Sequence, residues 1–201
     1  MILASGLLAG AGAVVLALSI FWARYPELHP AEMRTFRAIN HLPGWLYWIL
    51  WLPMQLGNLV VGCLAGVAVA LWKGDLGIGL AVVAATIVKL VVERVVRREM
   101  AAYLTVRQRP GTSEPGAILR GKDVPRSGMS FPSGHVILIT GISGLLALSL
   151  EWQYAWIPWV VTALVMLGRV YVGAHNPLDV TAGLGAGLLI GAGLLFVVAW
   201  L

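Results

Sequence analysis

Long apolar runs separated by short polar connections constrain the fold of this 201-residue chain more than any other feature. A run of about 18 or more apolar residues is long enough to cross the hydrocarbon core of a bilayer. Only 11% of the residues are charged, whereas a typical soluble domain has about 25%. The sequence therefore predicts an all-α polytopic membrane protein, and the short connections predict a single domain over residues 1–201.

Six membrane-spanning helices are predicted. The run from 45 to 72 is too long for one simple span, and Pro53, Gln55 and Asn58 interrupt it. We therefore expect residues 45–52 to lie at the membrane interface, where Trp and Tyr are favoured. The predicted helices, of which the third ends in a charged extension, cover 2–22, 53–72, 76–103, 131–150, 154–172 and 177–201.

Most basic residues lie in a basic segment from Lys89 to Arg126. The Gly- and Pro-rich segment 105–130, which overlaps its end, is predicted to be irregular. Basic residues beside a membrane are typical of a segment that contacts anionic headgroups, although simple anchoring at the interface produces the same pattern. No nucleic-acid partner is expected, because no row of aromatic residues interleaves with these charges. The single cysteine, Cys63, leaves no disulfide framework.

The last predicted span has small residues on one helical face, at Gly183, Gly187 and Gly191. Small residues at this spacing let helix backbones approach closely. Packing inside the bundle is the favoured interpretation, and a homodimer formed through this face is the alternative.

The first of two polar motifs is Pro-Ser-Gly-His at 132–135, where the fourth predicted span begins. Ser130 is predicted to cap this helix, with a proline in its first turn. The backbone N–H groups of Ser133, Gly134 and His135 would then have no helical partners. Such a helix start binds anions, and a glycine lets one come close.

The second motif is Arg169, His175 and Asp179, with Asn-Pro at 176–177 positioned to start the sixth helix. Asp179 would then lie in the first helical turn. A carboxylate four residues after a histidine can accept a hydrogen bond from the imidazole, which leaves the other ring nitrogen free as a nucleophile. Arg169 offers a planar donor fork for phosphate oxygens.

The predicted topology brings these motifs together. With six spans, the third helix ends, the fourth begins, the fifth ends and the sixth begins on one membrane face. A lone histidine at a membrane boundary is usually an interfacial residue. Two histidines, an arginine and an aspartate on one face indicate a functional site, since charged groups near spans are costly.

The motifs resemble those of the type 2 phosphatidic acid phosphatase superfamily, which includes lipid phosphate phosphatases and vanadium haloperoxidases. That family has three motifs: Lys-x6-Arg-Pro, Pro-Ser-Gly-His and Ser-Arg-x5-His-x3-Asp. Residues 132–135 match the second completely, and residues 168–179 match the third except that Gly168 replaces Ser. The six-span pattern is also similar, so the resemblance covers nearly the whole chain.

The first family motif is degenerate in this sequence. Arg109 and the proline after it match the end of the motif, but Ala102 stands at the Lys position. In another register Lys89 matches the Lys, Val96 stands at the Arg position and Arg97 is one residue late. The sequence leaves open which of these basic residues binds the phosphate.

The resemblance implies that His175 attacks phosphorus, that Asp179 orients it and that His135 protonates the leaving oxygen. It also implies that no metal or other cofactor is needed. The expected phosphate-binding residues are Arg169, Ser133, Gly134 and a basic residue from among Arg109, Lys89 and Arg97. Phosphoryl transfer depends mostly on positioning and charge stabilisation, which such a set supplies.

The expected function is hydrolysis of a lipid phosphate or diphosphate through a phosphohistidine intermediate. By analogy with the family, polyprenyl diphosphate is the first choice of substrate, and phosphatidic acid or phosphatidylglycerol phosphate comes next. The alternative is a non-catalytic lipid-binding or flippase-like protein on the same fold, against which the intact histidines argue. A haloperoxidase is the third choice, and the membrane spans argue against it.

The expected location is a bacterial plasma membrane, and the side on which the site lies is open. Bacterial relatives often face the site away from the cytoplasm. The positive-inside rule favours the cytoplasm instead, because three arginines outside any motif, Arg24, Arg34 and Arg37, lie on the same predicted face.

Overall fold

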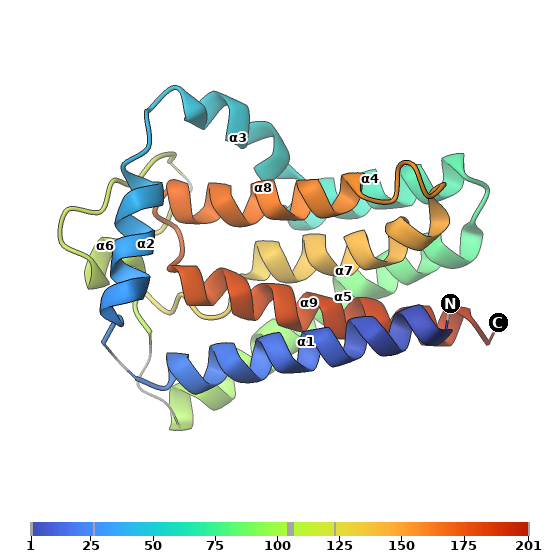
Figure 1. Cartoon of the computed structure of the whole chain (residues 1–201), viewed down its shortest axis with the longest axis horizontal. Coiled ribbons are helices and arrows are strands. Elements are labelled where there is room, and N and C mark those ends of the chain that lie inside the picture. Colours follow the sequence, from blue (N-terminus) through green and yellow to red (C-terminus); the bar gives the residue numbers. More distant parts are fainter. Residues whose placement is uncertain (1, 26, 104–106, 123, 201) are drawn as a thin grey trace.

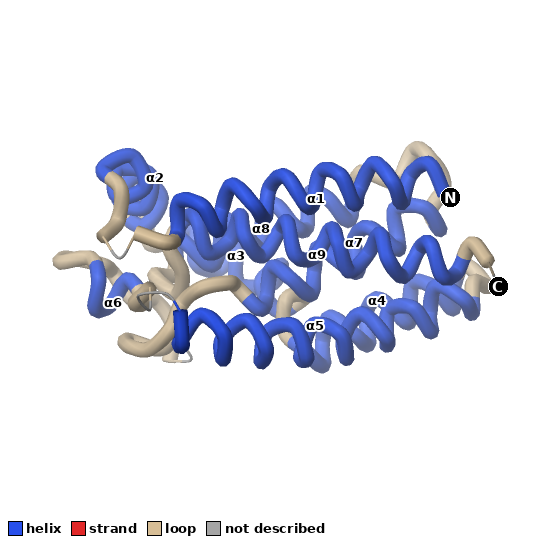
Figure 2. The backbone as a smooth tube through the Cα atoms, turned by 90° about the horizontal axis from the view of Figure 1, so that it is seen from below, coloured by secondary structure: helices blue, strands red, loops and turns tan. Residues whose placement is uncertain are grey.

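The structure is a computed structural model that describes residues 2–25, 27–103, 107–122 and 124–200, apart from the side chains at 97 and 100–103. Within these ranges every regular element is a helix (Figures 1 and 2). The helices are α1 (Ile2–Ala23), α2 (Pro30–Asn40), α3 (Leu46–Gln55), α4 (Leu59–Trp72), α5 (Leu76–Tyr103), α6 (Pro110–Ser113), α7 (Gly134–Ser149), α8 (Ile157–Tyr171) and α9 (Pro177–Val198).

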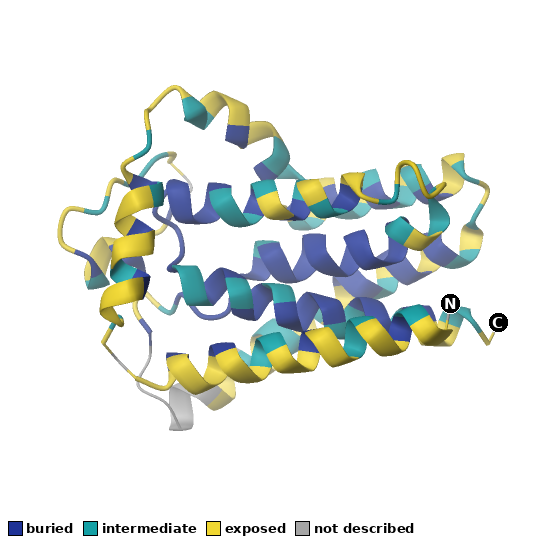
Figure 3. Ribbon diagram, viewed as in Figure 1, coloured by how far each residue is buried: buried dark blue, intermediate teal, exposed yellow. Residues whose placement is uncertain are grey.

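Helix α7 forms the centre of one bundle. Every residue from 136 to 146 is buried, and the helix packs against α4, α5, α8 and α9 (Figure 3). Helix α1 packs along α9 on the outside of the bundle. Both chain ends lie at one end of the bundle, whereas α2 and α6 lie at the other (Figure 1).

The outer surface of the bundle is apolar. Leu3 of α1 is 79% exposed, and Leu64 of α4 is 65% exposed. A soluble monomer rarely exposes apolar area on this scale. Exposed tryptophans lie toward both ends of the bundle, as in membrane-interface belts: Trp45, Trp48, Trp72, Trp152 and Trp200. The chain is therefore an integral membrane protein, and the predicted all-α membrane class is confirmed.

Helix length gives a smaller span count than the sequence predicts. Among the described residues, α1, α5 and α9 are long and apolar enough to cross a membrane, and the bent pair α3–α4 makes four if it is one span. Helix α1 has 22 residues, which rise about 33 Å at 1.5 Å each. Helices α7 and α8 have 16 and 15 residues. The predicted count of six is not confirmed.

The second predicted span begins later than the sequence suggests. Pro53 lies inside α3, and the chain bends by 69° between α3 and α4. The new helix starts where Asn58 Oδ1 accepts hydrogen bonds from the backbone N–H groups of Val60 (3.0 Å) and Val61 (3.5 Å). This cap decides the boundary. The bend also places Gly57 against the side chain of His135.

The fourth predicted span also begins later. Ser133, not Ser130, is the residue before the first turn of α7. The Ser130 hydroxyl instead donates to the carbonyl oxygens of Arg107 and Gln108, both at 3.2 Å. The Ser133 N–H donates to the Asp179 carbonyl at 2.9 Å. The helix does not begin at the predicted position, three residues earlier, because the Ser130 hydroxyl that was expected to cap it is hydrogen-bonded to a distant segment.

The glycine face of α9 packs inside the chain. A Cβ atom at Gly183 would lie 2.8 Å from the Ser133 carbonyl oxygen, and one at Gly187 would lie 2.6 Å from the Ile137 carbonyl oxygen. Gly191 likewise faces Gly141. This face is filled by α7, so a homodimer would have to use another surface.

Candidate active site

The second polar motif lies where α8 ends and α9 begins. Arg169 is in the last turn of α8, and Asp179 is in the first turn of α9, after Asn176 at the N-cap. His175 lies in the connection, with its N–H donating to the Arg169 carbonyl at 3.3 Å. His175 is 3% exposed and Asp179 is fully buried. The predicted helix start at 176–177 is confirmed.

Asp179 has a hydrogen-bond acceptor role at both oxygens. Its Oδ2 accepts from the Asn176 N–H at 2.7 Å and lies 3.8 Å from Nδ1 of His175. Its Oδ1 accepts from Nε of Arg107 at 3.2 Å. The 3.8 Å separation is longer than a hydrogen bond. Nδ1 is nevertheless the ring nitrogen that faces the carboxylate, so Nε2 is the one left to act as a nucleophile.

The pKa of His175 is lowered from 6.5 to about 4: burial is the largest cause and the nearby Arg169 charge adds to it, whereas Asp179 opposes the shift. An imidazole with this pKa is neutral at pH 7. A neutral ring is the form that can act as a nucleophile.

The first polar motif lies at the start of α7. Ser133 is fully buried, and its Oγ has no hydrogen-bond partner among the described residues. His135, in the first turn, is only partly buried. Arg169, Lys89 and Arg109 lie close enough to His135 for their charges to act on it. Both polar motifs and parts of the basic segment therefore come together, as the predicted topology requires.

An acidic residue that the sequence analysis did not select lies at the same helix start. Glu93 is ion-paired with Lys89 one helical turn earlier on α5. A Cβ atom at Gly134 would lie 2.5 Å from Oε2 of Glu93. The structure thus brings Lys89 to the start of α7 but partly neutralises it with a carboxylate.

Residues 107–122 of the Gly- and Pro-rich segment include Arg109, which contacts the connection that carries His175. Arg109 is 8% exposed, and its Nη1 donates to the Ala174 carbonyl at 2.8 Å, next to His175. Its backbone N–H donates to the Gly128 carbonyl at 3.1 Å. The side chain of Arg97, the third cation considered, lies outside the described residues.

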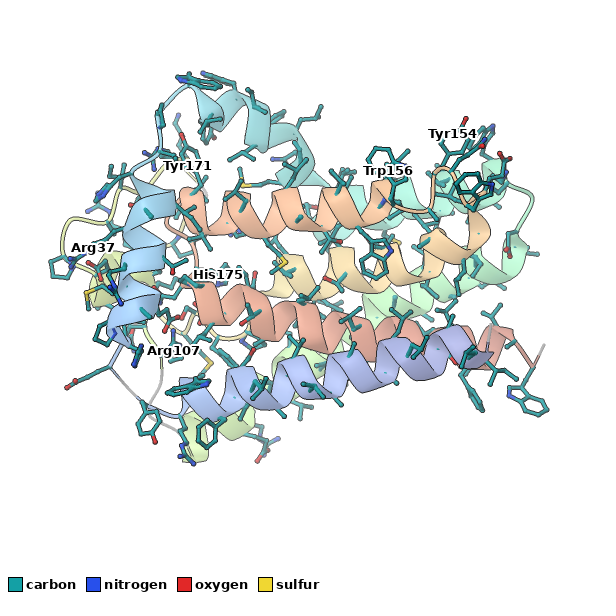
Figure 4. All side chains as sticks on the ribbon, in the orientation of Figure 1. Arg37, Arg107, Tyr154, Trp156, Tyr171 and His175 are labelled. Atoms are coloured by element: carbon teal, nitrogen blue, oxygen red, sulfur yellow. The ribbon has the colours of Figure 1, made fainter. Side chains whose placement is uncertain are left out.

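Sequence reasoning missed Arg107 and Glu32. Arg107 is ion-paired both with Asp179 and with Glu32 of α2. Figure 4 shows Arg107 and His175 at the end of the bundle where α2 lies. Burial raises the pKa of Glu32, and the Arg107 charge opposes this rise. One signal was available for Arg107, because residues two apart in an extended segment point to the same side. Arg107 and Arg109 therefore both face the site.

A cleft opens beside the site at the end of the bundle that carries α2. His135 and Arg169 line it, together with Arg120 and Val172. Helix α3 and the bend after it contribute Tyr47, Trp51, Met54, Gln55 and Asn58 to the lining. A molecule that enters this cleft can therefore reach the polar groups of both motifs.

A family model described as the PAP2 superfamily matches residues 75–201, which is more than half of the sequence. The chain belongs to the PAP2 superfamily. The match starts just before α5 and includes both histidine motifs. The resemblance predicted from residues 132–135 and 168–179 is therefore confirmed.

The sequence is also similar to a curated phosphatase. An undecaprenyl-diphosphatase of Sulfolobus acidocaldarius is 39% identical over 101 residues, which are 49% of this chain and 47% of the relative. The matched part thus spans about half the length of that protein.

Two solved structures share the fold. LpxE of Aquifex aeolicus has a TM-score of 0.73 at 21% identity, covering 85% of this chain and 98% of LpxE. A transmembrane PAP2-type phosphatidylglycerolphosphate phosphatase from Bacillus subtilis has a TM-score of 0.66 at 20% identity, covering 94% of both chains. At these identities the likeness establishes the fold of this PAP2 protein.

Proposed function

We propose that this PAP2 protein is a lipid phosphatase that works through a phosphohistidine intermediate, with a site formed by six membrane-spanning segments. The observation that carries the proposal is the meeting of a buried His175–Asp179 pair, the partly exposed His135 and three buried arginines at one end of an apolar bundle. Charged groups collected at a membrane protein's helix ends are costly and are typical of function.

In the proposed reaction, Nε2 of His175 attacks phosphorus while the bond from phosphorus to the leaving oxygen breaks. His135 donates a proton to that oxygen. Water then attacks the phosphorus of the phosphohistidine while the bond from phosphorus to Nε2 breaks, His135 accepts a proton from the water, and inorganic phosphate leaves. Catalytic hydrogen bonds often shorten only when substrate is bound, so we expect the 3.8 Å separation between His175 and Asp179 to close as the ring becomes positive.

The developing charge on the phosphoryl oxygens needs donors placed in advance. Arg169 and Arg109 are buried next to the histidines and supply charge-assisted hydrogen bonds. The N–H groups of Gly134 and His135 and the buried Ser133 hydroxyl supply neutral ones, whereas the Ser133 N–H already donates to the Asp179 carbonyl. Lys89 and Arg97 are further candidates on α5.

An apolar groove supports a lipid rather than a water-soluble phosphate ester. It has an empty volume of about 560 Å³ between α4, α7 and α8, and its lining is almost entirely apolar. Three α7 residues on the same helical face as His135 line it one after another: Ile139, Ile142 and Leu146. Leu56 at its near end precedes Gly57, which touches His135. A hydrocarbon chain in this groove would leave its phosphate beside the histidines.

Polyprenyl diphosphate is the substrate that we propose first, supported by the undecaprenyl-diphosphatase that shares 39% identity with half of this chain. Phosphatidic acid and phosphatidylglycerol phosphate come next. We place the protein in a bacterial plasma membrane. Activity of a terminal reporter fusion would assign the side of the site, because both chain ends lie at the opposite end of the bundle (Figure 1).

The test of function is phosphate release by purified protein in detergent from each of these three lipids. His175→Ala is expected to abolish turnover, because loss of the nucleophile should exceed the ~10²–10⁴-fold contribution of general acid catalysis alone. His41→Ala, which removes an exposed histidine outside the site, is the matched control and should retain activity. If the wild-type protein releases no phosphate, or the His175 variant releases it normally, the proposal is wrong.

A further inference from the structure

A buried chain of charges links helix α2 to the proposed catalytic pair. Glu32 of α2 accepts from Nη2 of Arg107 through Oε1, and Arg107 donates from Nε to Oδ1 of Asp179 at 3.2 Å. The side chains of Glu32, Arg107 and Asp179 are only 5%, 1% and 0% exposed. Neither contact is local, because the partners are 72 and 75 residues apart in sequence.

The contact with Arg107 determines what Asp179 can do. A buried carboxylate is costly without a compensating charge. The nearest positive partner at Asp179 is Arg107 on Oδ1, so Oδ2 is left to face His175. The Asn176 N–H holds Oδ2 from the other side at 2.7 Å. Arg107 and this N–H together fix the carboxylate in the orientation that His175 requires.

Glu32 in turn holds Arg107. The same Oε1 that accepts from Arg107 also accepts from the Leu178 N–H at 3.0 Å, in the first turn of α9. Helix α9 begins with Pro177, and its first N–H groups have no helical partners. The Leu178 N–H is one of these groups, so its bond to Glu32 joins α2 to the helix that carries Asp179. Two of the three guanidinium nitrogens of Arg107 are thus bound to carboxylates, which sets the direction of the Nε–H bond.

We propose that Arg107 is a positioning residue that acts through Asp179, and that Glu32 of α2 holds it in place. This inference rests on the proposed function for its activity assay. Arg107 differs in this from Arg109, whose Nη1 lies beside Ala174 and His175 and which is expected to contact phosphate. A residue that acts only through Asp179 should change the rate of phosphoryl transfer and leave substrate binding almost unchanged.

The test is a double-mutant cycle of Arg107→Gln with Asp179→Asn, measured as kcat and KM in detergent. Arg107→Gln is expected to lower kcat about 10–100-fold, by analogy with the range seen when the partners that orient metal-binding side chains are removed, with KM within about twofold. In the Asp179→Asn background the same change should cost less than about threefold, because residues that act as a unit are not additive. An effect on KM, equal losses in both backgrounds, or wild-type activity of Arg107→Gln would each overturn the inference.

Two further variants keep the result interpretable. Glu32→Gln retains the shape of the side chain and should also lower kcat, again with little effect in the Asp179→Asn background; it decides the question if Arg107→Gln does not fold. Arg37→Gln is the matched control, because it breaks another ion pair of α2, the one with Glu114 at 2.6 Å. Arg37→Gln should behave as wild type, and a loss of kcat equal to that of Glu32→Gln would show that any loosening of α2 is enough.

Vanadate affinity, measured by calorimetry, repeats the cycle without turnover. Arg107→Gln is expected to weaken vanadate binding in the wild-type background and to have little effect in Asp179→Asn. This readout separates the two ideas. A wild-type protein that is inactive on lipids would refute the proposed function, whereas uncoupled vanadate affinities would refute the role of Arg107.

Discussion

The low pKa of His175 leads to a specific pH dependence. Burial, helped by the Arg169 charge, lowers this pKa from 6.5 to about 4. At pH 5.5 a histidine with a pKa of about 4 is ~97% unprotonated, whereas one with a pKa of 6.5 is only ~9% unprotonated. Because only the neutral ring can attack phosphorus, kcat/KM at pH 5.5 should be about tenfold higher than an ordinary histidine would allow. Activity should be lost only as the pH falls through about 4.

The assay is the pH profile of kcat/KM between pH 3.5 and 8, which reports the pKa values of the free enzyme. Phosphate monoesters have their own pKa near 6, so two substrates with different phosphate pKa values are needed. An acid limb that belongs to His175 stays in place when the substrate changes. Initial rates are required, because a histidine that is harder to protonate when folded destabilises the folded state below pH 6.5.

Asp179→Asn supplies the matched control for this profile. The Asp179 carboxylate raises the pKa of His175, so its neutralisation should move the acid limb to lower pH while kcat falls. A limb with its midpoint near 6.5 for both substrates would refute the reasoning. Such a midpoint would mean that, during catalysis, the His175 ring is neither buried nor close to the arginine charges.

Three further outcomes are expected. Phosphate release should continue in excess EDTA, as the family resemblance implies, and vanadate should inhibit it because five-coordinate vanadium resembles the in-line transition state; a requirement for added divalent metal in the same assay would contradict this. Lys89, Arg97 and Arg109 are each replaced by Ala in separate variants. Arg109→Ala should lose at least tenfold in kcat/KM, since a charge-assisted phosphate contact contributes roughly 1.5–3 kcal/mol, and Lys89→Ala should lose less because Glu93 already neutralises Lys89. Full efficiency in all three variants would show that other residues bind the phosphate. Gly134→Ala should fold normally but lose activity, because the new methyl group would meet the movable Glu93 carboxylate at 2.5 Å and narrow the anion site; thermal unfolding and kcat/KM together check this.

The membrane class and both polar motifs could be predicted from the sequence because they depend on local patterns. Apolar run length predicts α1, α5 and α9 within a few residues of their observed bounds. The start of α9 follows from Asn-Pro at 176–177, and the four-residue spacing of His175 and Asp179 brings their side chains within 3.8 Å. Each of these features needs only neighbours along the chain.

Tertiary structure decided the helix boundaries and the partners of the buried charges. Helix α7 begins after Ser133 because the Ser130 hydroxyl donates to the carbonyl oxygens of Arg107 and Gln108 and does not cap the helix. Arg107 reaches Asp179 only because the fold places it between Glu32 of α2 and the start of α9. A buried carboxylate takes its compensating charge from whichever segment the fold places beside it. No fixed spacing in the sequence records that choice, so the role of Arg107 became visible only when α2, α9 and the basic segment were seen together.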